Sequence, residues 1–310
     1  MKYSVVIPIY GNEESLPDLF KVLSDLNTAL DGLLEAVFVI DGSPDRSFER
    51  VREALPHFTF AAQLLVHSRN FGSFAAIRTG LATARGTYFG VMAADLQEPP
   101  QLLLEFFDLL DRDVCDVVLG TRISRKDPLL SRMTSGLFWA LYRRWIVPEM
   151  PPGGVDIFGC NREFKEQILK LEESRSSLIA LIFWLGFRRE LIGYERRARV
   201  HGKSAWSFRK KAEYMLDSVF AFTDYPIRLL IRLGSVGVLV SLLLSVFVVV
   251  AKISGLIPVP GYAATMLTVL FLGGLNLLGI GVVGNYAWRT YENTKQRPLS
   301  IVARKFKNDL

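Results

Sequence analysis

The sequence contains little cysteine, with only two residues of this type, Cys115 and Cys160, among 310. Both lie in apolar runs of strand-like composition, far apart in the chain. This pattern argues against a disulfide-stabilised scaffold and against a cysteine-based metal site, so we expect two buried thiols in a reducing compartment. A cleavable signal peptide is also not expected, because the N-terminus leads directly into a strand pattern.

Charge is missing from two long segments near the C-terminus. Residues 233–251 and residues 262–288 contain no Asp, Glu, Lys or Arg. The first run, of 19 residues, is close to the ~20 that cross a bilayer as a helix, and the second is long enough to span with tilt. Between them, Pro258 and Pro260 indicate a short loop. The sequence therefore predicts a transmembrane hairpin, with two buried helices of a soluble protein as the alternative.

Basic residues flank the outer ends of this hairpin, and only Lys252 lies in the loop. The flanking residues are Arg228, Arg232, Arg289, Lys295, Arg297, Arg304, Lys305 and Lys307. The positive-inside rule then predicts a multi-pass protein of the inner membrane, with both termini and the part of the chain before the hairpin in the cytoplasm. The formal net charge of +6 fits either nucleic acid or an anionic membrane surface, and the flanking positions favour the membrane.

The first part of the chain alternates strand and helix patterns. Apolar strand patterns occupy residues 3–9, 36–40, 63–66, 87–92 and 116–120, and helix patterns occupy residues 13–30, 73–84 and 102–110. Such alternation predicts an α/β domain with a mostly parallel sheet and helices on both faces. Further on, residues 190–200 resemble a strand, and residues 151–162 form a glycine-rich approach to Asp156 followed by a helix start. Residues 128–147 and 206–222 resemble amphipathic helices, the first either at a membrane interface or packed on the sheet.

Polar residues follow four of these strands, at Asp41, Arg69, Asp95 and Arg122. The carboxyl ends of parallel strands share one edge, where open α/β sheets bind ligands. In the segment VMAADLQEPP, Asp95 and Gln97 offer two oxygen ligands suited to Mg²⁺ or Mn²⁺. The alternative is a strand end closed by an Asx turn.

A G-x-G-x-x-G match at Gly279, Gly281 and Gly284 has a different explanation. A dinucleotide-binding fingerprint needs a strand before it and a helix after it, whereas this match lies inside an uncharged run of membrane length. Gly274, Gly281 and Asn285 share one helix face, so we expect close helix packing there.

Several motifs occur in a characteristic order: VVIPIYGNEESLP, FVIDGSPDRS, HSRNFGSFAAIRTGL, ARGTYFGVMAADLQEPP, GTRISR and GGVDIFGCNR. Together with the C-terminal hairpin, they resemble the polyprenyl-phosphate glycosyltransferases of glycosyltransferase family 2, a group that includes the bactoprenol glucosyltransferases. The resemblance covers residues 3–225. It implies a GT-A fold that binds a nucleotide-sugar through a divalent metal and passes the sugar, with inversion, to a lipid phosphate.

The resemblance also implies roles for individual residues. Pro8, Tyr10 and Glu14 resemble the wall of the nucleotide-base pocket, and Asp41 resembles the carboxylate that holds the base. Asp95 and Gln97 resemble the metal ligands at the diphosphate. Asp156 resembles the catalytic carboxylate that faces the acceptor. A phosphate monoester is already mostly dianionic at cytoplasmic pH, so this favours a positioning or charge-tuning role for Asp156 over that of a general base, which stays the alternative. Phosphate-binding roles fall on Arg122, Arg125, Arg196, Arg199, Lys203 and Ser204.

Three positions depart from the family pattern. Family members usually have Asp-Ala-Asp-Leu-Gln, but the first position here is Ala93, which removes one carboxylate from the metal and sugar region. The usual Asp-Asp-Gly-Ser is Ile40-Asp41-Gly42-Ser43, and Gly11 is inserted before Asn12.

The leading hypothesis is transfer of glucose from UDP-glucose to undecaprenyl phosphate. Alternatives are the same reaction with an aminoarabinose derivative, mannose or galactose, a processive polysaccharide synthase, and a non-catalytic sugar-nucleotide-binding scaffold. Only two apolar segments and the lack of a Gln-x-x-Arg-Trp motif argue against the synthase. A nucleic-acid partner would explain the charge but not those segments.

The expected domains are a GT-A catalytic domain over 1–205, an amphipathic helix over 206–228, two transmembrane helices over 229–289 and a basic tail over 290–310. The resemblance and the small-residue face of the hairpin suggest a homo-oligomer, for example a tetramer.

Overall fold

The computed structural model describes residues 1–124, 140, 142–144, 146–151, 154–173, 176–197, 208–254, 261–308 and 310. They divide into two compact units, Met1–Tyr214 with Arg297–Leu310, and Met215–Gln296.

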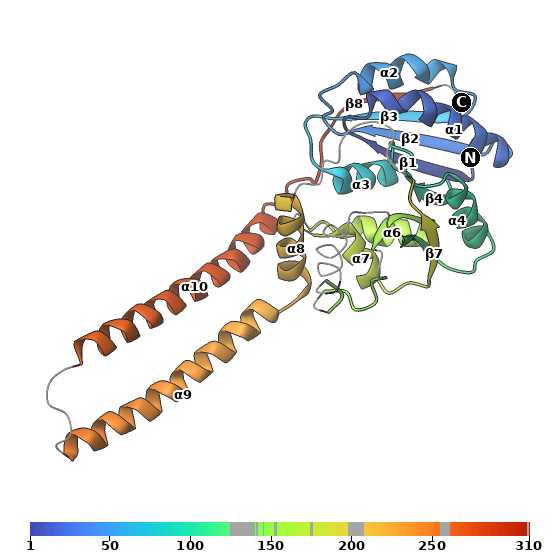
Figure 1. Ribbon diagram of the computed structural model, residues 1–310. Coiled ribbons are helices and arrows are strands. Elements are labelled where there is room, and N and C mark those ends of the chain that lie inside the picture. The colour runs from blue at the N-terminus through green and yellow to red at the C-terminus, as the bar shows by residue number, and fades with distance from the viewer. Residues whose placement is uncertain are drawn as a thin grey trace. The chain divides into compact units, whose positions relative to one another are not determined.

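One eight-stranded sheet organises the first unit (Figure 1). Its strands are β1 (Tyr3–Ile9), β2 (Leu34–Ile40), β3 (Ala61–His67), β4 (Tyr88–Val91), β5 (Val117–Ser124), β6 (Val155–Asn161), β7 (Arg189–Glu195) and β8 (Val302–Lys307). Their order across the sheet is β7-β5-β6-β4-β1-β2-β3-β8. β6 runs antiparallel to β4 and β5, and β8 runs antiparallel to β3, while the other neighbours are parallel. The predicted α/β class with a mostly parallel sheet is confirmed.

Helices connect the strands of this unit. They are η1 (Glu13–Ser15), α1 (Leu16–Ala29), α2 (Ser47–Ala54), η2 (Leu55–His57), α3 (Ser73–Thr83), α4 (Gln101–Asp111), α6 (Arg162–Lys170) and α7 (Leu178–Trp184). In Figure 1, α1 and α2 lie on one face of strands β1 to β3 and α3 lies on the other. Both faces of the central strands are therefore covered, which is why β2 is buried at every position.

Alternate residues of the central strands fill the two cores. Phe38 of β2 is fully buried with Leu19 of α1 and Phe106 of α4 in one of them. On the opposite face, Gly80 of α3 packs so closely on Val6 that a Cβ atom would collide with the valine side chain. Each large apolar side chain buried in this way contributes about 1.5–3 kcal/mol to folding. The two cysteines are buried and unpaired, as predicted.

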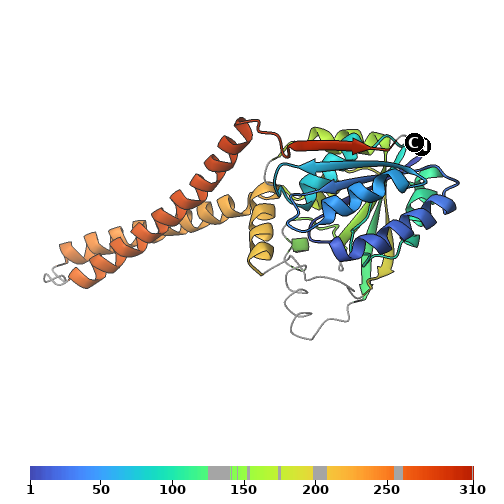
Figure 2. The ribbon, with the colours of Figure 1, turned by 90° about the horizontal axis from the view of Figure 1, so that it is seen from above.

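The C-terminal segment does not form the simple basic tail that we expected. Residues 302–307 form β8, which extends the sheet beyond β3, as Figure 2 shows. β8 is held mainly by backbone hydrogen bonds to β3, because its side chains are mostly exposed. For the same reason its sequence lacks the apolar pattern that predicts a buried strand. The first unit is thus built from two stretches that lie on either side of the second unit in the sequence.

The second unit contains most of α8 (Phe208–Phe222) and two long helices, α9 (Tyr225–Ile253) and α10 (Tyr262–Thr294). The predicted pair of helices is present, and the G-x-G-x-x-G match lies inside α10 with no strand before it. Within the part of the chain that the structure describes, no helix combines the length and the hydropathy needed to cross a bilayer. The expected close packing at Gly274 and Gly281 is not seen, since an added Cβ would meet no described atom within 4 Å.

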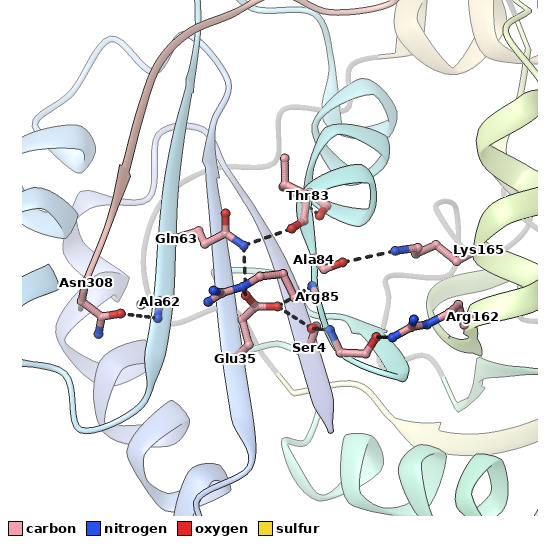
Figure 3. A network of polar contacts seen from close by, with 12 residues as sticks. Ser4, Glu35, Ala62, Gln63, Thr83, Ala84, Arg85, Arg162, Lys165 and Asn308 are labelled. Carbon is pink, nitrogen blue, oxygen red and sulfur yellow. Dashed lines mark hydrogen bonds and ion pairs between the residues drawn. The ribbon is translucent and has the colours of Figure 1, made fainter. Parts of the chain in front are cut away.

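A buried polar network holds the amino-terminal edge of the sheet together (Figure 3). Glu35 at the start of β2 is fully buried, and it accepts hydrogen bonds from Ser4 (2.6 Å), Gln63 (2.9 Å) and both the backbone and side chain of Arg85 (2.7 Å each). Burial alone would raise the pKa of Glu35, but these hydrogen bonds outweigh it and hold the pKa below its usual value. This edge is structural and leaves the opposite edge for ligands.

Candidate functional site

The carboxyl ends of β1, β2, β3, β4 and β5 lie along one edge of the sheet, because these strands all run in the same direction. The polar strand ends predicted from the sequence therefore share an edge. This edge, with the loops that leave it, is the candidate site.

The chain makes a tight turn directly after β4. The backbone N–H of Gln97 donates to Oδ1 of Asp95 (3.3 Å), so the Asx turn considered as an alternative is present. Between these residues, Leu96 has a φ of +53°, in the left-handed region that a leucine rarely adopts. The turn is thus held in an unfavourable conformation, and it places a carboxylate and an amide side by side on the ligand-binding edge.

Gln97 is joined to the segment after β7 by three hydrogen bonds. Nη2 of Arg196 donates to Oε1 of Gln97 (2.6 Å), and Nε2 of Gln97 donates to the carbonyl oxygen of Arg197 (3.3 Å). The backbone N–H of Arg197 donates to the carbonyl oxygen of Gln97 (2.9 Å). The structure thus brings together two of the predicted site residues, Gln97 and Arg196.

The next residue, Glu98, was missed by the sequence interpretation. Its side chain is only 4% exposed, and its Oε2 atom has no hydrogen-bond partner among the described residues. Burial, followed by the nearby charge of Asp156, raises the pKa of Glu98 to about 7, although Arg196 opposes the shift. An acidic residue before a proline pair looks like an ordinary helix start, so nothing in the sequence indicates this burial.

Asp156 on β6 is held from two sides. The guanidinium of Arg122 donates to both of its carboxylate oxygens, and the hydroxyl of Tyr194 donates to Oδ2 (2.6 Å). Burial and the charge of Asp156 raise the pKa of Tyr194, so the phenol remains a donor. Arg122, expected to bind the acceptor phosphate, is here bonded to Asp156. Tyr194 was not predicted, because a tyrosine within a strand pattern looks like a core residue.

Asp41, directly after β2, is 2% exposed, and both of its carboxylate oxygens accept hydrogen bonds within the protein. It accepts hydrogen bonds from the backbone N–H groups of Phe71 and Gly72 and lies 2.8 Å from Nδ1 of His67. Burial alone would raise the pKa of Asp41, but the bonds to His67 and to these N–H groups lower it. In this arrangement Asp41 fixes the loop before α3, and its contact with a nucleotide base stays a prediction.

The predicted base-pocket residues lie near the end of β1. Pro8 is half-buried within the strand, Tyr10 is 46% exposed just after it, and Glu14 is exposed in η1. The backbone N–H of the inserted Gly11 donates to Ser43 Oγ (2.8 Å), which connects this loop to the loop after β2. Tyr10 therefore presents an accessible ring beside that junction.

Comparison with known proteins decides the family. The sequence profile of glycosyl transferase family 2 matches residues 4–175. The chain belongs to glycosyltransferase family 2. It is 33% identical to an uncharacterized glycosyltransferase of Synechocystis, over 98% of this chain and 95% of the relative. It is 30% identical to the bactoprenol glucosyl transferase of Shigella phage SfX, over 97% of this chain and 99% of the relative.

The fold of this glycosyltransferase is also found in a solved structure. Glucosyl-3-phosphoglycerate synthase of Mycobacterium tuberculosis, in complex with Mn²⁺, UDP and phosphoglyceric acid, superposes with a TM-score of 0.50 and 16% identity. The match covers 72% of this chain and 80% of that one. At this identity the likeness concerns the fold alone, and it supports the predicted GT-A class.

Four of the residues predicted for phosphate binding in this glycosyltransferase lie outside the described residues. They are Arg125, Arg199, Lys203 and Ser204. Their roles stay predictions.

The residues after β4 suit a hard divalent cation. Asp95 and Gln97 supply oxygen donors, and Oε2 of the buried Glu98 is a further oxygen atom without a hydrogen-bond partner among the described residues. Among those residues, no group of three or more His, Cys, Asp and Glu side chains could hold a metal alone. A cation here would take further oxygen ligands from its substrate.

Proposed function

We propose that this glycosyltransferase moves a hexose, with glucose from UDP-glucose as the best candidate, onto undecaprenyl or another polyprenyl phosphate, with inversion. The observation that carries the proposal is the strained turn at Asp95-Leu96-Gln97, on the ligand-binding edge and in contact with Arg196. Relatives named bactoprenol glucosyl transferase support the acceptor and the sugar. The mycobacterial neighbour, which holds Mn²⁺ and UDP, supports the donor class.

Asp95 and Gln97 would hold a Mg²⁺ or Mn²⁺ ion. When bound, such an ion offsets the negative charge that develops on the departing nucleoside diphosphate. Arg196 lies beside the same turn, and its guanidinium can pair bidentately with a phosphate group of the donor. The exposed ring of Tyr10 offers a surface for the base, with Pro8 and Glu14 near it.

The acceptor needs little help from a general base. A phosphate monoester has its second pKa near ~6, so it is mostly dianionic at neutral pH and is already nucleophilic. Asp156, fixed by Arg122 and Tyr194, then acts mainly by positioning. The carboxylate would orient the Arg122 guanidinium for contact with the acceptor phosphate.

We also propose that α9 and α10 place the protein in the inner membrane, as a homo-oligomer with its termini in the cytoplasm. Large apolar side chains are exposed along both helices, at Leu243 (64%) and Phe247 (68%) in α9 and at Phe271 (71%) and Leu277 (72%) in α10. Contiguous exposed apolar surface is unfavourable in water and indicates contact with lipid or protein. An anchor of this kind would keep the enzyme in the membrane that contains its lipid acceptor.

A transfer assay tests the function. Membranes containing the protein are incubated with radiolabelled UDP-glucose, with and without EDTA, and the label is measured in the organic extract. Lipid label that depends on metal supports the proposal. If label is transferred from UDP-galactose, GDP-mannose or an aminoarabinose donor but not from UDP-glucose, the reaction stands and the sugar assignment changes. Labelled polymer would indicate a processive synthase. Nucleotide binding without any transfer would indicate a scaffold, the alternative that Ala93 favours.

A further inference from the structure

Arg196 is hydrogen-bonded to an oxygen atom that the proposed metal site would use as a ligand. Its Nη2 atom donates to Oε1 of Gln97 at 2.6 Å, the oxygen that the proposed function assigns to the cation. Its Nε atom is 3.8 Å from Oε1 of Glu98 and has no hydrogen-bond partner among the described residues. The guanidinium is therefore held firmly at Gln97 and only loosely at Glu98.

The surrounding charges explain why a cation is retained here. Glu98 is almost completely buried, and Oε2 of its carboxylate has no hydrogen-bond partner among the described residues. Buried carboxylates need a positive partner, because an uncompensated buried charge is strongly unfavourable. In the protein without substrate, Arg196 supplies that partner, which is the same electrostatic role that a divalent cation would have.

Simultaneous binding of Arg196 and a divalent cation to Oε1 of Gln97 is energetically unfavourable. An ion bound at Oε1 would place two like charges within a few ångströms of each other in a partly buried site, where screening is weak. One of the two must leave. The diphosphate of a donor offers Arg196 a better partner, because guanidinium groups bind phosphate through two parallel hydrogen bonds.

We propose that Arg196 competes with the divalent cation for Gln97, so that the free protein binds metal weakly and the donor admits the metal by drawing Arg196 away. This inference rests on the proposed function, because that function assigns Gln97 to the metal. It predicts positive coupling between donor and metal, with Arg196 as its source.

The test measures Mn²⁺ binding by electron paramagnetic resonance of the free ion, with and without UDP. In the wild-type protein, UDP should tighten Mn²⁺ binding strongly. Arg196→Gln should tighten Mn²⁺ binding without nucleotide by about tenfold, the scale of one hydrogen bond to a charged group. The same variant should lower the effect of UDP on Mn²⁺ affinity by a similar factor.

Arg112→Gln is the matched control, because it removes one positive charge from an arginine whose side chain is 67% exposed on the surface. It should leave Mn²⁺ binding unchanged. Arg196→Met provides a second variant if the glutamine substitution impairs folding, and circular dichroism of each variant establishes that the fold is retained.

Equal Mn²⁺ affinity of the wild-type protein and both Arg196 variants without nucleotide would overturn the inference. If wild-type protein with UDP binds Mn²⁺ in that case, the metal assignment of the proposed function survives without it. If the wild-type protein binds no Mn²⁺ even with UDP, the metal assignment fails together with the inference.

Discussion

Asp156 is the residue whose surroundings most clearly limit its role. It is bonded to Arg122 and Tyr194, and a dianionic acceptor does not require it as a base. We therefore expect Asp156→Asn to keep nucleotide binding but to lower turnover about 100-fold, because the amide no longer orients Arg122 and small misplacements are costly. Isothermal titration with UDP and the lipid-transfer assay measure the two effects separately.

Tyr194→Phe serves as the comparison, since it removes one hydrogen bond to the same carboxylate and leaves the Arg122 pair intact. We expect a smaller loss of turnover for Tyr194→Phe than for Asp156→Asn. A wild-type rate for Asp156→Asn would show that the carboxylate has no part in the reaction.

Glu35 should affect stability and its dependence on pH. Its pKa is lower in the folded protein than the ordinary value of 4.5, so it stabilises the fold above that value. This contribution is lost as the pH falls through the folded-state pKa. Glu35→Gln should lower the free energy of unfolding at pH 7 by roughly 2–3 kcal/mol, because it removes the negative partner of Arg85.

Urea unfolding at pH 7, 5 and 4 measures this effect. The difference between wild type and Glu35→Gln should narrow towards pH 4, whereas Glu105→Gln, at an exposed position of α4, should match wild type throughout. A constant difference at all three values would mean that the Glu35 carboxylate is not the titrating group.

Single elements were predictable where local pattern and tertiary burial agree. β1 was predicted with its observed bounds, since a continuous apolar run of strand length is buried in the sheet. β6 was missed, because Gly154 and Gly159 near its ends resemble a loop, although the helix start was recognised and Asn161 caps α6. β8 was missed because an exposed edge strand has no apolar signal.

Site residues follow the same division. The turn at Asp95 and Gln97, directly after a strand, could be predicted because an apolar run ends in two oxygen-bearing side chains, and their metal-binding role stays a prediction. The burial of Glu98 and the Tyr194 contact to Asp156 depend on strands distant in sequence, so no local pattern contains them. The hydrogen bonds of Asp41 to His67 and to the backbone N–H groups before α3 likewise depend on tertiary structure.

The anchoring of β8 should matter for stability. Asn308 accepts a hydrogen bond from the N–H of Ala62 and donates to the carbonyl oxygen of Phe60, both at 2.8 Å. Asn308→Ala removes both and should lower the free energy of unfolding by about 1–3 kcal/mol. Thermal unfolding measures this, with Lys305→Ala on the exposed strand surface as the control. Equal melting temperatures would indicate that the two Asn308 hydrogen bonds add nothing to the stability of the catalytic unit.

At the scale of the whole molecule, the membrane proposal depends on where the end of α9 lies. Ser254→Cys places a thiol at the exposed end of this helix, and Gln296→Cys places one beyond α10. If the helices cross the bilayer, a membrane-impermeant thiol reagent applied to intact cells should label the first and not the second. The native Cys115 and Cys160 are buried and should not react.

Labelling of neither thiol in intact cells, but of both after lysis, would place the hairpin on one side of the membrane. Recovery of the protein in the aqueous fraction without detergent would exclude a membrane anchor.

The central claim is that Asp95 and Gln97 hold a cation beneath the diphosphate of a sugar donor. A crystal soaked with UDP-glucose and Mn²⁺, with anomalous diffraction collected at the manganese edge, tests it most directly. The account predicts one anomalous peak within coordination distance of Asp95 and Gln97, bridged to the diphosphate, with Arg196 turned from Gln97 to a phosphate oxygen. A diphosphate bound elsewhere, with no manganese at this turn and Arg196 still on Gln97, would contradict it.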